Sequence, residues 1–346
     1  MSNPKKLMKV GVYYSNKDVR VEYRDIPKIG DKEILVKVRA CGICGSDVME
    51  WYRMKSAPRV LGHEMTGDVV EVGRDVKEFK VGDRVFVSHH VPCNSCRYCL
   101  RGDHTLCRTL HSTNFDPGGF SEYVRVPEIN VRIGTFLLPD EITYDEGVFI
   151  EPLACVIRGF RIADIRPNHT LAIIGSGIAG LLQVKLARAW GLKKIIAVDI
   201  NDYRLRKAEE FGADVAIRAD EDVPRRIKEE NDGYLADRVI LSAGVGSAFI
   251  QSLKCVDKGG TLLLFAPLSP DQNIPLNIFD IWNRQIRIVS TYAGSPRDIS
   301  EAIEVLKNKI IDVNDMITHR IKLDDIQRGF DLVSRAGESI KVIIYP

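Results

Sequence analysis

The chain has 346 residues, of which 45% are hydrophobic and 28% are charged, and its formal net charge is +2. This length exceeds one ordinary hydrophobic core, so we expect two domains. Lysines and arginines are dispersed, which argues against nucleic acid as a partner. No apolar run approaches the roughly 20 residues of a membrane span, so we expect no membrane association. Residues 1–6 lack the apolar core of a signal peptide, which favours a cytoplasmic protein.

The first part of the chain has the pattern of short β-strands separated by glycine turns. Residues 34–40 alternate clearly, and residues 67–73 and 82–87 read as further strands. Residues 48–58 read as irregular. We therefore expect an all-β body whose loops carry cysteine and histidine.

Four of the eight cysteines are packed into one loop, residues 89–108. The spacing C-x2-C-x2-C-x7-C suits a tetrahedral zinc with four thiolates and no open position. Such a zinc would fold a lobe that has little core of its own. An iron–sulfur cluster competes, but runs of that type usually end in Cys-Pro and Arg108 follows here. Two disulfides, or four free thiols without a role, remain as further alternatives. The predicted ligands are Cys93, Cys96, Cys99 and Cys107.

A second set of candidate ligands is scattered along the chain: Cys41, Cys44, His63, Glu64 and Glu151. A catalytic zinc takes about three protein ligands and keeps a position for water or substrate. One thiolate, one imidazole and one carboxylate would supply them. Each residue also has an ordinary interpretation: a core histidine, a surface carboxylate, or a redox pair of cysteines. The spacing alone leaves these alternatives open.

From about residue 145 the apolar period changes. Residues 145–163 have helical spacing, and from residue 171 strands and helices alternate, which predicts a doubly wound parallel sheet. After residue 292 we expect one helix, a polar stretch and a final strand. The expected strands begin near residues 171, 194, 238, 261 and 286, with helices at 202–211, 223–230 and 299–307, and a last strand at 341–345.

Residues 171–199 read as strand, glycine turn, helix, strand and acid. The first glycine allows a tight turn, the second lets a pyrophosphate approach the backbone, and the third lets the helix pack closely on the strand. The helix N-terminus then faces the phosphates. The alternative is a glycine turn that binds nothing. The predicted cofactor-binding residues are Gly175, Gly177, Ile178, Ala179, Gly180, Asp199 and Arg204.

Asp199 lies 19 residues after Gly180 (199 − 180). A carboxylate there can accept both ribose hydroxyls of NAD. It would also repel the 2′-phosphate of NADP, and no arginine follows directly. Arg204 is expected on the adenine side. We therefore expect NAD as the cofactor.

Six motifs occur in one order: Gly-Ile-Cys44-Gly-Ser-Asp47, Gly62-His63-Glu64, the cysteine lobe, Gly118-Gly119-Phe120, Glu151-Pro152 and the glycine turn. This order resembles the zinc-dependent medium-chain alcohol/polyol dehydrogenase family, in its sorbitol/threonine dehydrogenase-like branch. The resemblance covers nearly the whole chain. It implies an α/β protein with a GroES-like β-rich catalytic domain at 1–148 and 294–346, which includes the zinc lobe at 89–108. A Rossmann NAD-binding domain would occupy 149–293.

The resemblance assigns roles to the scattered ligands. Cys44 and His63 match the ligands of the catalytic zinc, and Cys41 would be a buried spectator. Glu64 would either ligate the metal or lie next to it. Glu151 matches a position that holds glutamate in the sorbitol/threonine branch and cysteine in classical alcohol dehydrogenases.

The same resemblance implies that Ser46 passes the substrate proton onward and that Asp47 orients the zinc-bound histidine. The chain departs from the family at two places. Residues 48–50 lack the histidine that completes the proton relay in some members. Thr291 stands where the polyol branch often has an arginine, which argues against sorbitol itself as the substrate.

The resemblance implies an NAD-dependent oxidoreductase with two zinc ions per chain, one catalytic and one structural. Its substrate would be a small secondary alcohol of the polyol, inositol or sugar-derived kind, with L-threonine second. A zinc protein that binds NAD without dehydrogenase activity is the alternative of another class. The family also implies a homotetramer, and we expect the apolar residues 274–279 to extend a sheet across a subunit contact.

Overall fold

The computed structural model describes residues 6–346, so most of the segment on which the signal-peptide prediction rests lies outside the described residues. The chain divides into two compact units. One contains the chain up to Ala154 together with Ala293–Pro346, and the other is Cys155–Tyr292. The first unit therefore takes its elements from both ends of the chain.

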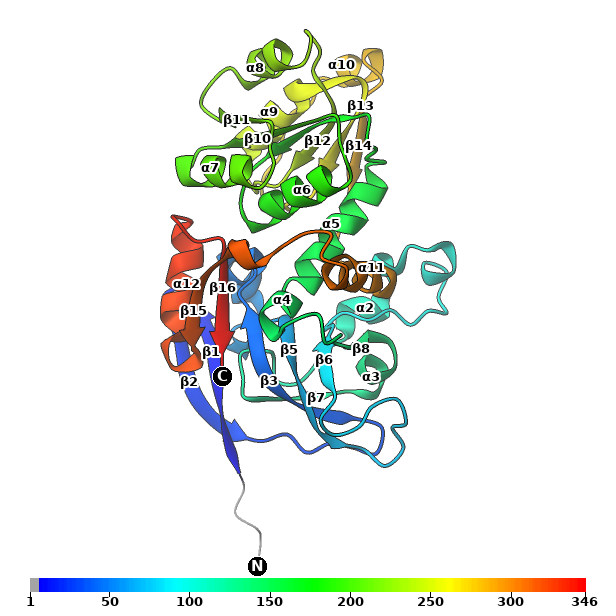
Figure 1. The fold of residues 1–346 in the computed structure, drawn as a ribbon, viewed down its shortest axis with the longest axis vertical. Coiled ribbons are helices and arrows are strands. Elements are labelled where there is room, and N and C mark those ends of the chain that lie inside the picture. The colour runs from blue at the N-terminus through cyan, green and yellow to red at the C-terminus, as the bar shows by residue number, and fades with distance from the viewer. Residues whose placement is uncertain (1–5) are drawn as a thin grey trace, which may run out of the picture. The chain divides into compact units, whose positions relative to one another are not determined.

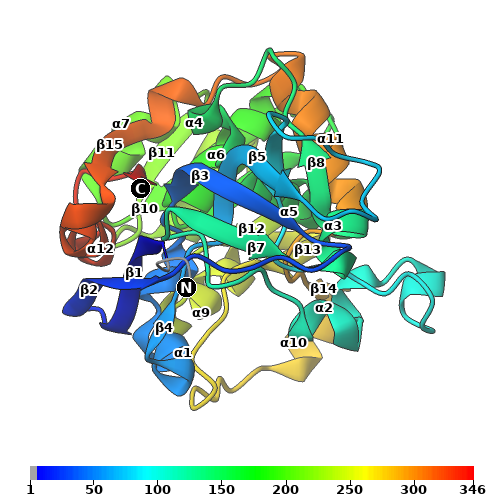
Figure 2. The ribbon, with the colours of Figure 1, turned by 90° about the horizontal axis from the view of Figure 1, so that it is seen from below.

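The first unit is built on two β-sheets. The larger has the order β15-β16-β3-β5-β6-β8 with β7 paired to β3, and the smaller has the order β2-β1-β4. Figure 2 shows β3 between β5 and β7. Inward-facing valines and isoleucines of both sheets form one hydrophobic core. The strands are β1 (Leu7–Ser15), β2 (Asp18–Asp25), β3 (Ile34–Gly42), β4 (Arg59–Val60), β5 (Glu64–Val72), β6 (Arg84–Val87), β7 (Tyr123–Val126), β8 (Thr135–Leu137), β15 (Ile317–Lys322) and β16 (Lys341–Tyr345).

The helices of this unit are short. The single helix expected over residues 145–163 is two helices, with the break at residues 148–149. The hydroxyl of Thr143 caps the first of them by accepting from the N–H of Glu146. The second of the two, α5 (Ile150–Ile162), crosses the boundary between the units. The others are α1 (Glu50–Arg53), α2 (Arg108–Ser112), α3 (Glu128–Gly134), α4 (Tyr144–Gly147), α11 (Pro296–Lys307) and α12 (Ile326–Arg335).

The polar stretch expected before the last strand contains two elements, β15 and α12. α12 buries Ile326, Gly329 and Phe330, and Leu332 and Val333 pack partly buried against the same core. Phe330 packs on Tyr13 and Phe120.

The second unit is a six-stranded parallel sheet with the order β11-β10-β9-β12-β13-β14. α6 and α7 contact β9, β10 and β11, whereas α8 packs on α9, which contacts β12 and β13 (Figure 1). The prediction of a doubly wound parallel sheet is confirmed. All five residues of the first strand are buried, as expected for a strand covered on both faces. The elements are β9 (Thr170–Ile174), α6 (Ile178–Ala189), β10 (Lys194–Asp199), α7 (Asp202–Glu210), β11 (Val215–Arg218), α8 (Val223–Glu230), β12 (Ala236–Leu241), α9 (Gly246–Cys255), β13 (Val256–Leu264), α10 (Ile278–Asn283) and β14 (Arg287–Ser290).

Ile278 and Phe279, which were expected to extend a sheet across a subunit contact, lie instead in a helix, α10 (Ile278–Asn283). The side chain of Asn277 caps this helix by accepting from the N–H of Asp280 at 3.2 Å. The outer strand of the sheet on this side is β14. Ile278 and Phe279 are nonetheless exposed, at 66% and 69%.

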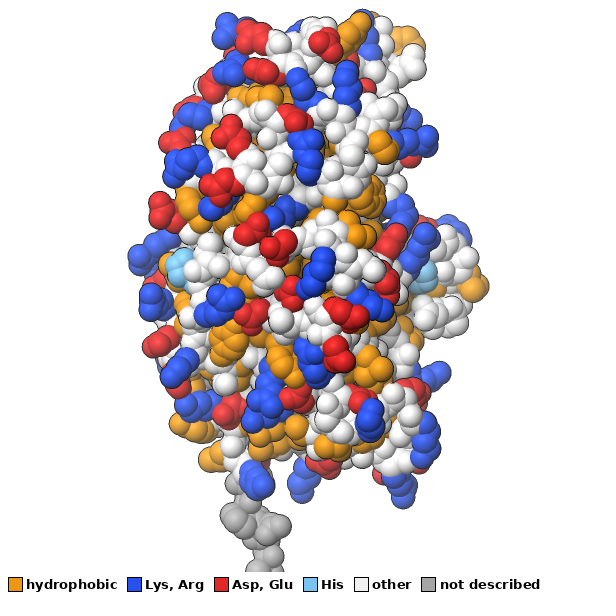
Figure 3. Space-filling model, viewed as in Figure 1, with side chains coloured by type: hydrophobic (Ala, Val, Ile, Leu, Met, Phe, Trp, Pro, Cys, Tyr) orange, Lys and Arg blue, Asp and Glu red, His pale blue; other side chains and the backbone are white. Residues whose placement is uncertain are grey.

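Surface charge agrees with the composition. Lysine and arginine side chains alternate with aspartate and glutamate over the face drawn in Figure 3, with no broad field of one sign. Among the described residues, no helix is both long and apolar enough to cross a bilayer.

Candidate catalytic metal site and cofactor turn

Three predicted ligands of the catalytic metal come together in the first unit. Cys44, His63 and Glu64 each offer one ligand atom, and these atoms lie within 4.8 Å of one another. The antiparallel pairing of β3 with β5 places Gly42 opposite Glu64 and so brings the two segments side by side. A thiolate, an imidazole and a carboxylate are the donors that a catalytic zinc uses, so the residues present fit this metal. Among the described residues, Glu151 is not part of this group; it is half-buried in the first turn of α5.

Asp47 lies beneath the cluster and is fully buried. Its carboxylate accepts from the N–H of Cys44 at 3.1 Å and lies 3.5 Å from Nδ1 of His63. Burial raises the pKa of Asp47, but His63 and Arg53 outweigh it, and the pKa falls below its usual value. Burial lowers the pKa of His63, but Asp47 and Cys44 outweigh it and raise the pKa well above its usual value. Asp47 thus fixes the position of His63 as a carboxylate behind a metal ligand does.

Ser46 is held by Arg53, a residue that the sequence did not single out. Nη2 of Arg53 donates to Oγ of Ser46 at 2.9 Å and to Oδ1 of Asp47 at 3.2 Å, while Nε donates to the carbonyl of Ser46 at 2.9 Å. The N–H of Ser46 in turn donates to Sγ of Cys44 at 3.4 Å. The hydroxyl expected to move the substrate proton is therefore fixed next to the metal ligands.

Glu64 makes an ion pair that the sequence also did not indicate. Nζ of Lys341 in β16 donates to Oε2 of Glu64 at 2.5 Å, and the two side chains are 0% and 1% exposed. A Cβ at Gly42 would lie 2.2 Å from the same Oε2. Glycine at position 42 therefore leaves room for this pair, which ties the last strand of the chain to the cluster.

Cys41 stays out of the cluster. Its thiol is buried, and Cβ atoms at Gly62 and Gly119 would lie 2.9 and 2.7 Å from its sulfur. Burial raises the pKa of Cys41 well above its usual value. The residue packs as a small hydrophobe.

Two histidines that the sequence analysis passed over lie next to His63. The ring centroids of His63 and His89 are 4.9 Å apart, and those of His89 and His90 are 3.7 Å apart. Burial, more than the neighbouring cations, lowers the pKa of His89 well below its usual value, and it lowers that of His90 to about 3. Both imidazoles are therefore neutral at pH 7 and add polar atoms beside the cluster without adding charge.

The four cysteines of the lobe form the second cluster. Their sulfurs lie within 4.8 Å of one another, and none of the eight cysteines forms a disulfide. The lobe projects as a loop next to α2 (Figures 1 and 2). Its hydrophobic core contains, besides the cysteines, only Leu110 among the described residues.

The thiols of this lobe differ in acidity. Hydrogen bonds from the backbone and hydroxyl of Ser95 lower the pKa of Cys93 to about 5, while burial raises that of Cys99 to about 12. The protein alone thus stabilises a single negative charge on Cys93 more readily than on Cys99. A bound cation is needed to keep all four as thiolates, and four sulfurs at this spacing fit zinc.

The glycine turn of the second unit has the geometry that its sequence predicts. Gly175 has φ +103°, which favours glycine, and a Cβ at Gly180 would lie 2.0 Å from the carbonyl oxygen of Gly175. A Cβ at Gly177 would meet only Nη1 of Arg204, at 3.9 Å. α6 begins directly after it, at Ile178-Ala179. The turn therefore leaves open space in front of a helix N-terminus, which fits a pyrophosphate.

Asp199 ends β10 beside this turn. Its Oδ2 accepts from the N–H of Ser176 at 2.7 Å, and its Oδ1 accepts from the N–H of Asn201 at 2.9 Å. Nε of Arg204 is buried and has no hydrogen-bond partner among the described residues. A fixed carboxylate and a half-buried guanidinium thus flank the turn.

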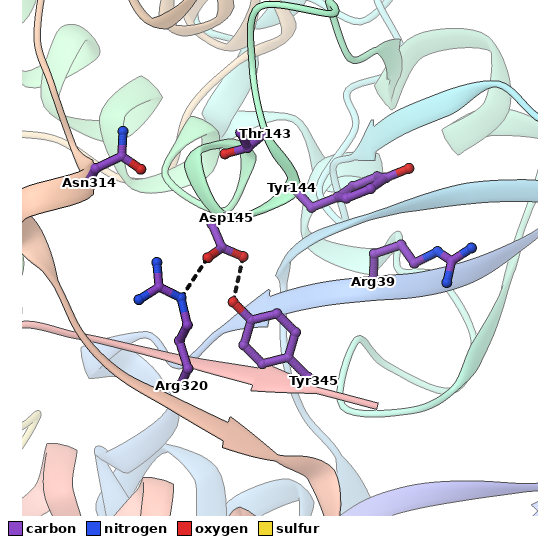
Figure 4. A pocket seen from close by; sticks show the side chains of 7 residues that line it. All are labelled: Arg39, Thr143, Tyr144, Asp145, Asn314, Arg320 and Tyr345. Carbon is purple, nitrogen blue, oxygen red and sulfur yellow. Dashed lines mark hydrogen bonds and ion pairs between the residues drawn. The ribbon is translucent and has the colours of Figure 1, made fainter.

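A surface pocket of about 560 Å³ lies elsewhere in the first unit. Figure 4 shows Asp145 in it, accepting from Nε of Arg320 at 2.8 Å and from the hydroxyl of Tyr345 at 2.5 Å. Arg39, on another wall, is paired with Asp68 at 2.6 Å. Its arginines are already paired and none of its residues belongs to a metal cluster, so we do not assign it a catalytic role.

A metal cluster of thiolate, imidazole and carboxylate and a dinucleotide-type glycine turn define a class, the zinc-dependent dehydrogenases. Residues 30–134 match the family described as alcohol dehydrogenase GroES-like domain, and residues 179–308 match zinc-binding dehydrogenase. The chain belongs to the zinc-dependent medium-chain alcohol/polyol dehydrogenase family, whose GroES-like and Rossmann folds the sequence predicted. Both predictions are confirmed.

Relatives of known name cover nearly the whole chain. It is 33% identical to a sorbitol dehydrogenase of Bacillus subtilis, over 98% of this chain and 97% of that protein. It is also 33% identical to an L-threonine 3-dehydrogenase of Caldanaerobacter subterraneus, over 96% and 97%. A solved zinc-binding dehydrogenase of Sinorhizobium meliloti with NADP bound has a TM-score of 0.88 and 32% identity, with 99% and 100% of the two chains covered.

Proposed function

We propose that this chain transfers a hydride from a secondary alcohol of the polyol, inositol or sugar-derived kind to NAD, with one catalytic and one structural zinc. The observation that carries the proposal is the cluster of Cys44, His63 and Glu64 with the Ser46 hydroxyl fixed beside it. Glu151 remains a predicted fourth participant. A cytoplasmic location remains a prediction from the sequence.

The residues of the chain have separable tasks in this reaction. Cys44 and His63 hold the metal, and Asp47 keeps the imidazole in position. When bound, zinc lowers the pKa of the substrate hydroxyl as a Lewis acid, and the nicotinamide accepts the hydride. Ser46 takes the hydroxyl proton. Because Arg53 already donates to Oγ of Ser46, the hydroxyl of Ser46 can donate its own proton outward.

Replacement of one ligand tests the proposal. Cys44→Ser should abolish NADH formation with any alcohol, while NAD still protects the chain against thermal unfolding. Cys41→Ser is the matched control, because its sulfur lies three residues away in the same motif but outside the cluster. Full activity of the Cys44→Ser protein would refute the metal assignment.

Asp199 supports NAD over NADP. Its buried carboxylate is fixed by two backbone N–H groups at the position expected for the ribose hydroxyls, and a 2′-phosphate there would meet a negative charge. We expect kcat/KM to be at least about tenfold higher with NAD, a difference of about 1.4 kcal/mol. Asp199→Ser should reduce the preference, and Arg204→Gln should not. Equal kcat/KM for both cofactors in the unmodified chain would contradict this.

Two other functions are distinguished by simple measurements. Oxidation of L-threonine at the 3-hydroxyl is the second candidate, and the similarity to a threonine dehydrogenase supports it. A substrate panel of polyols, inositols, sugar acids and threonine, followed by NADH absorbance, ranks it against the first. A zinc protein that binds NAD without turnover would fail with the whole panel, whereas one zinc per chain, in place of two, would indicate a structural metal alone.

We also propose that the chain forms a homotetramer through α10 and the neighbouring edge strand β14. The exposed side chains of Ile278, Phe279 and Trp282 give this face an apolar patch, and β14 has a free edge. Light scattering should give the mass of four chains. Phe279→Glu should reduce that mass, whereas Tyr234→Glu, at an exposed tyrosine of the same unit, should not.

A further inference from the structure

We propose that Arg53, Arg59 and His89 form an anion-binding subsite beside the catalytic metal ligands, and that the alcohol oxidised there carries a carboxylate or a phosphoryl group. This inference rests on the proposed function and narrows its substrate class. Four observations support it, one for each of the three side chains and one for the charge balance around them.

Arg53 has hydrogen-bond donors to spare. Its Nε and Nη2 are engaged by Ser46 and Asp47, and Nη1 makes no hydrogen bond in the described part of the chain. The side chain is 13% exposed, so the guanidinium is largely withdrawn from water. Because Nη2 contacts the Ser46 hydroxyl at 2.9 Å, the two N–H groups on Nη1 are held close to the reacting centre.

The guanidinium of Arg59 has no hydrogen-bond or ion-pair partner among residues 6–346. It precedes Val60 in β4, and because Val60 is buried in the core, Arg59 lies on the opposite face of the strand. It is half-buried, yet no hydrogen bond or ion pair engages its guanidinium in this part of the chain. Arg59 precedes the predicted ligand His63 by four residues (63 − 59), and burial and then the charge of Arg53 lower its pKa, while Tyr52 and Asp47 raise it. A half-buried unpaired cation is costly unless an anion joins it.

His89 offers an unsatisfied polar atom at the same place. Its ring lies 4.9 Å from that of His63, and its Nδ1 is buried with no hydrogen-bond partner among the described residues. His63 in turn lies 3.5 Å from Oδ1 of Asp47, to which Nη2 of Arg53 donates at 3.2 Å, so His89 and Arg53 flank the same predicted metal ligand and its partner. A neutral imidazole hydrogen-bonds a substrate hydroxyl or acid group as donor or acceptor according to its tautomer.

The carboxylates near the cluster are already neutralised. Asp47 serves both Arg53 and His63, and Glu64 is paired with Lys341. Glu50, the remaining acid on α1, is exposed and accepts from the N–H of Asn16 at 3.2 Å. The positive charge of Arg59 is therefore left without a counterion. A carboxylate or phosphoryl group matches the planar fork of a guanidinium, whereas a neutral polyol does not.

The test compares alcohols that share a polyhydroxylated six-carbon chain and differ in the group at one end, which is a hydroxymethyl, a carboxylate or a phosphate ester. Sorbitol, gluconate and sorbitol 6-phosphate are supplied to the zinc-loaded chain, and kcat/KM is measured by NADH formation. We expect at least one of the two anions to exceed sorbitol by tenfold or more, and the preferred anion identifies the group. Arg59→Gln should lower kcat/KM for that anion 10- to 100-fold, mainly through KM, and change that for sorbitol less than threefold. Arg328→Gln, at an exposed arginine of α12, is the matched control and should change neither.

Calorimetric binding of the same three compounds separates this inference from the proposed function. If none is oxidised but gluconate or sorbitol 6-phosphate binds more tightly than sorbitol and loses that advantage in Arg59→Gln, the subsite stands and the dehydrogenase proposal fails for these alcohols. Sorbitol bound or oxidised as well as both anions would overturn the subsite. So would an equal effect of Arg59→Gln on sorbitol and on the anions.

Discussion

Two metal clusters in the same β-rich unit differ in what holds their ligands. Cys44, His63 and Glu64 project from a body with a large hydrophobic core, and buried partners such as Asp47 and Lys341 hold them. The four cysteines of the lobe have almost no core beneath them, only Leu110 besides their own side chains. The packing of the unit holds the ligands of the first cluster in place. The cysteine loop has no such support, so its own conformation depends on the cluster.

This difference indicates what a metal would contribute at each cluster. A loop without a core cannot offset its conformational entropy by burial, so metal binding supplies the missing free energy. The ligands of the other cluster are already fixed, so a metal there adds chemistry and little folding energy. The predictions below test this contrast, in order of decreasing effect.

The largest effect is expected from Cys107→Ser. Removing one of four thiolates should release the structural metal, whose binding is worth roughly 10–16 kcal/mol in small zinc domains. Zinc content should fall from about two to about one ion per chain, and residues 93–107 should lose hydrogen-exchange protection while β3 and β5 keep theirs. Cys255→Ser, a buried thiol of the other unit, should leave zinc content unchanged. If residues 93–107 kept their hydrogen-exchange protection after losing zinc, the two clusters would not differ in what holds their ligands.

Lys341→Met tests whether buried partners hold the first cluster. The change leaves Glu64 buried without its cation, and breaking such a pair costs about 3–5 kcal/mol. Chemical denaturation should show this loss, whereas Lys322→Met, at an exposed lysine of β15, should stay within about 0.5 kcal/mol. A loss below about 1 kcal/mol would mean that the pair does not secure the cluster.

Asp47→Asn tests the support behind the histidine. The amide keeps the shape but loses the charge that faces His63 and Arg53, and such changes typically cost 10- to 100-fold in metal affinity or activity. kcat/KM and zinc content should therefore fall, and the melting temperature should fall as well because Arg53 loses its buried partner. The control is Asp324→Asn, whose exposed carboxylate pairs with Lys9. Unchanged kcat/KM in the Asp47→Asn protein would exclude an orienting role.

Glu146→Gln tests a contribution to the stability of the first unit that involves neither metal cluster. Burial raises the pKa of Glu146, but hydrogen bonds from Lys309, Thr143 and Asn314 outweigh it and lower the pKa below its usual 4.5. A lowered folded-state pKa gives stability that is present above pH 4.5 and lost as the pH falls through the folded value. The variant should thus be less stable by about 1–2 kcal/mol at pH 7, with the difference vanishing in acid. A difference that persists at low pH would contradict this.

The sequence predicted the features that depend on local pattern. The alternation of strands and helices gave the doubly wound sheet, and the spacing of glycines gave the turn at 175–180 with its positive φ. The cysteine spacing predicted four sulfurs in one cluster. In each case the residues that determine the feature are neighbours in sequence, so their chemistry can be read from a short window.

The features that were missed depend on contacts between distant residues. Lys341 lies 277 positions from Glu64, and no local pattern marks one lysine of a last strand as buried. Arg53 follows Ser46 by seven residues in a stretch that reads as irregular, and only the fold of α1 brings its guanidinium back to the hydroxyl. Ile278 and Phe279 were expected at a sheet edge because they are apolar, whereas the Asn277 side chain caps a helix that begins at Ile278.

The pairing of β16 with β3 has a consequence for the order in which the two units fold during synthesis. The second unit is continuous from Cys155 to Tyr292 and can fold as soon as that segment has emerged from the ribosome. The first unit must wait, because Ile343 and Ile344 complete its sheet and Lys341 pairs with Glu64. A chain halted before residue 341 can therefore complete the parallel sheet of the second unit, but it lacks the strand and the lysine that support Glu64 in the first.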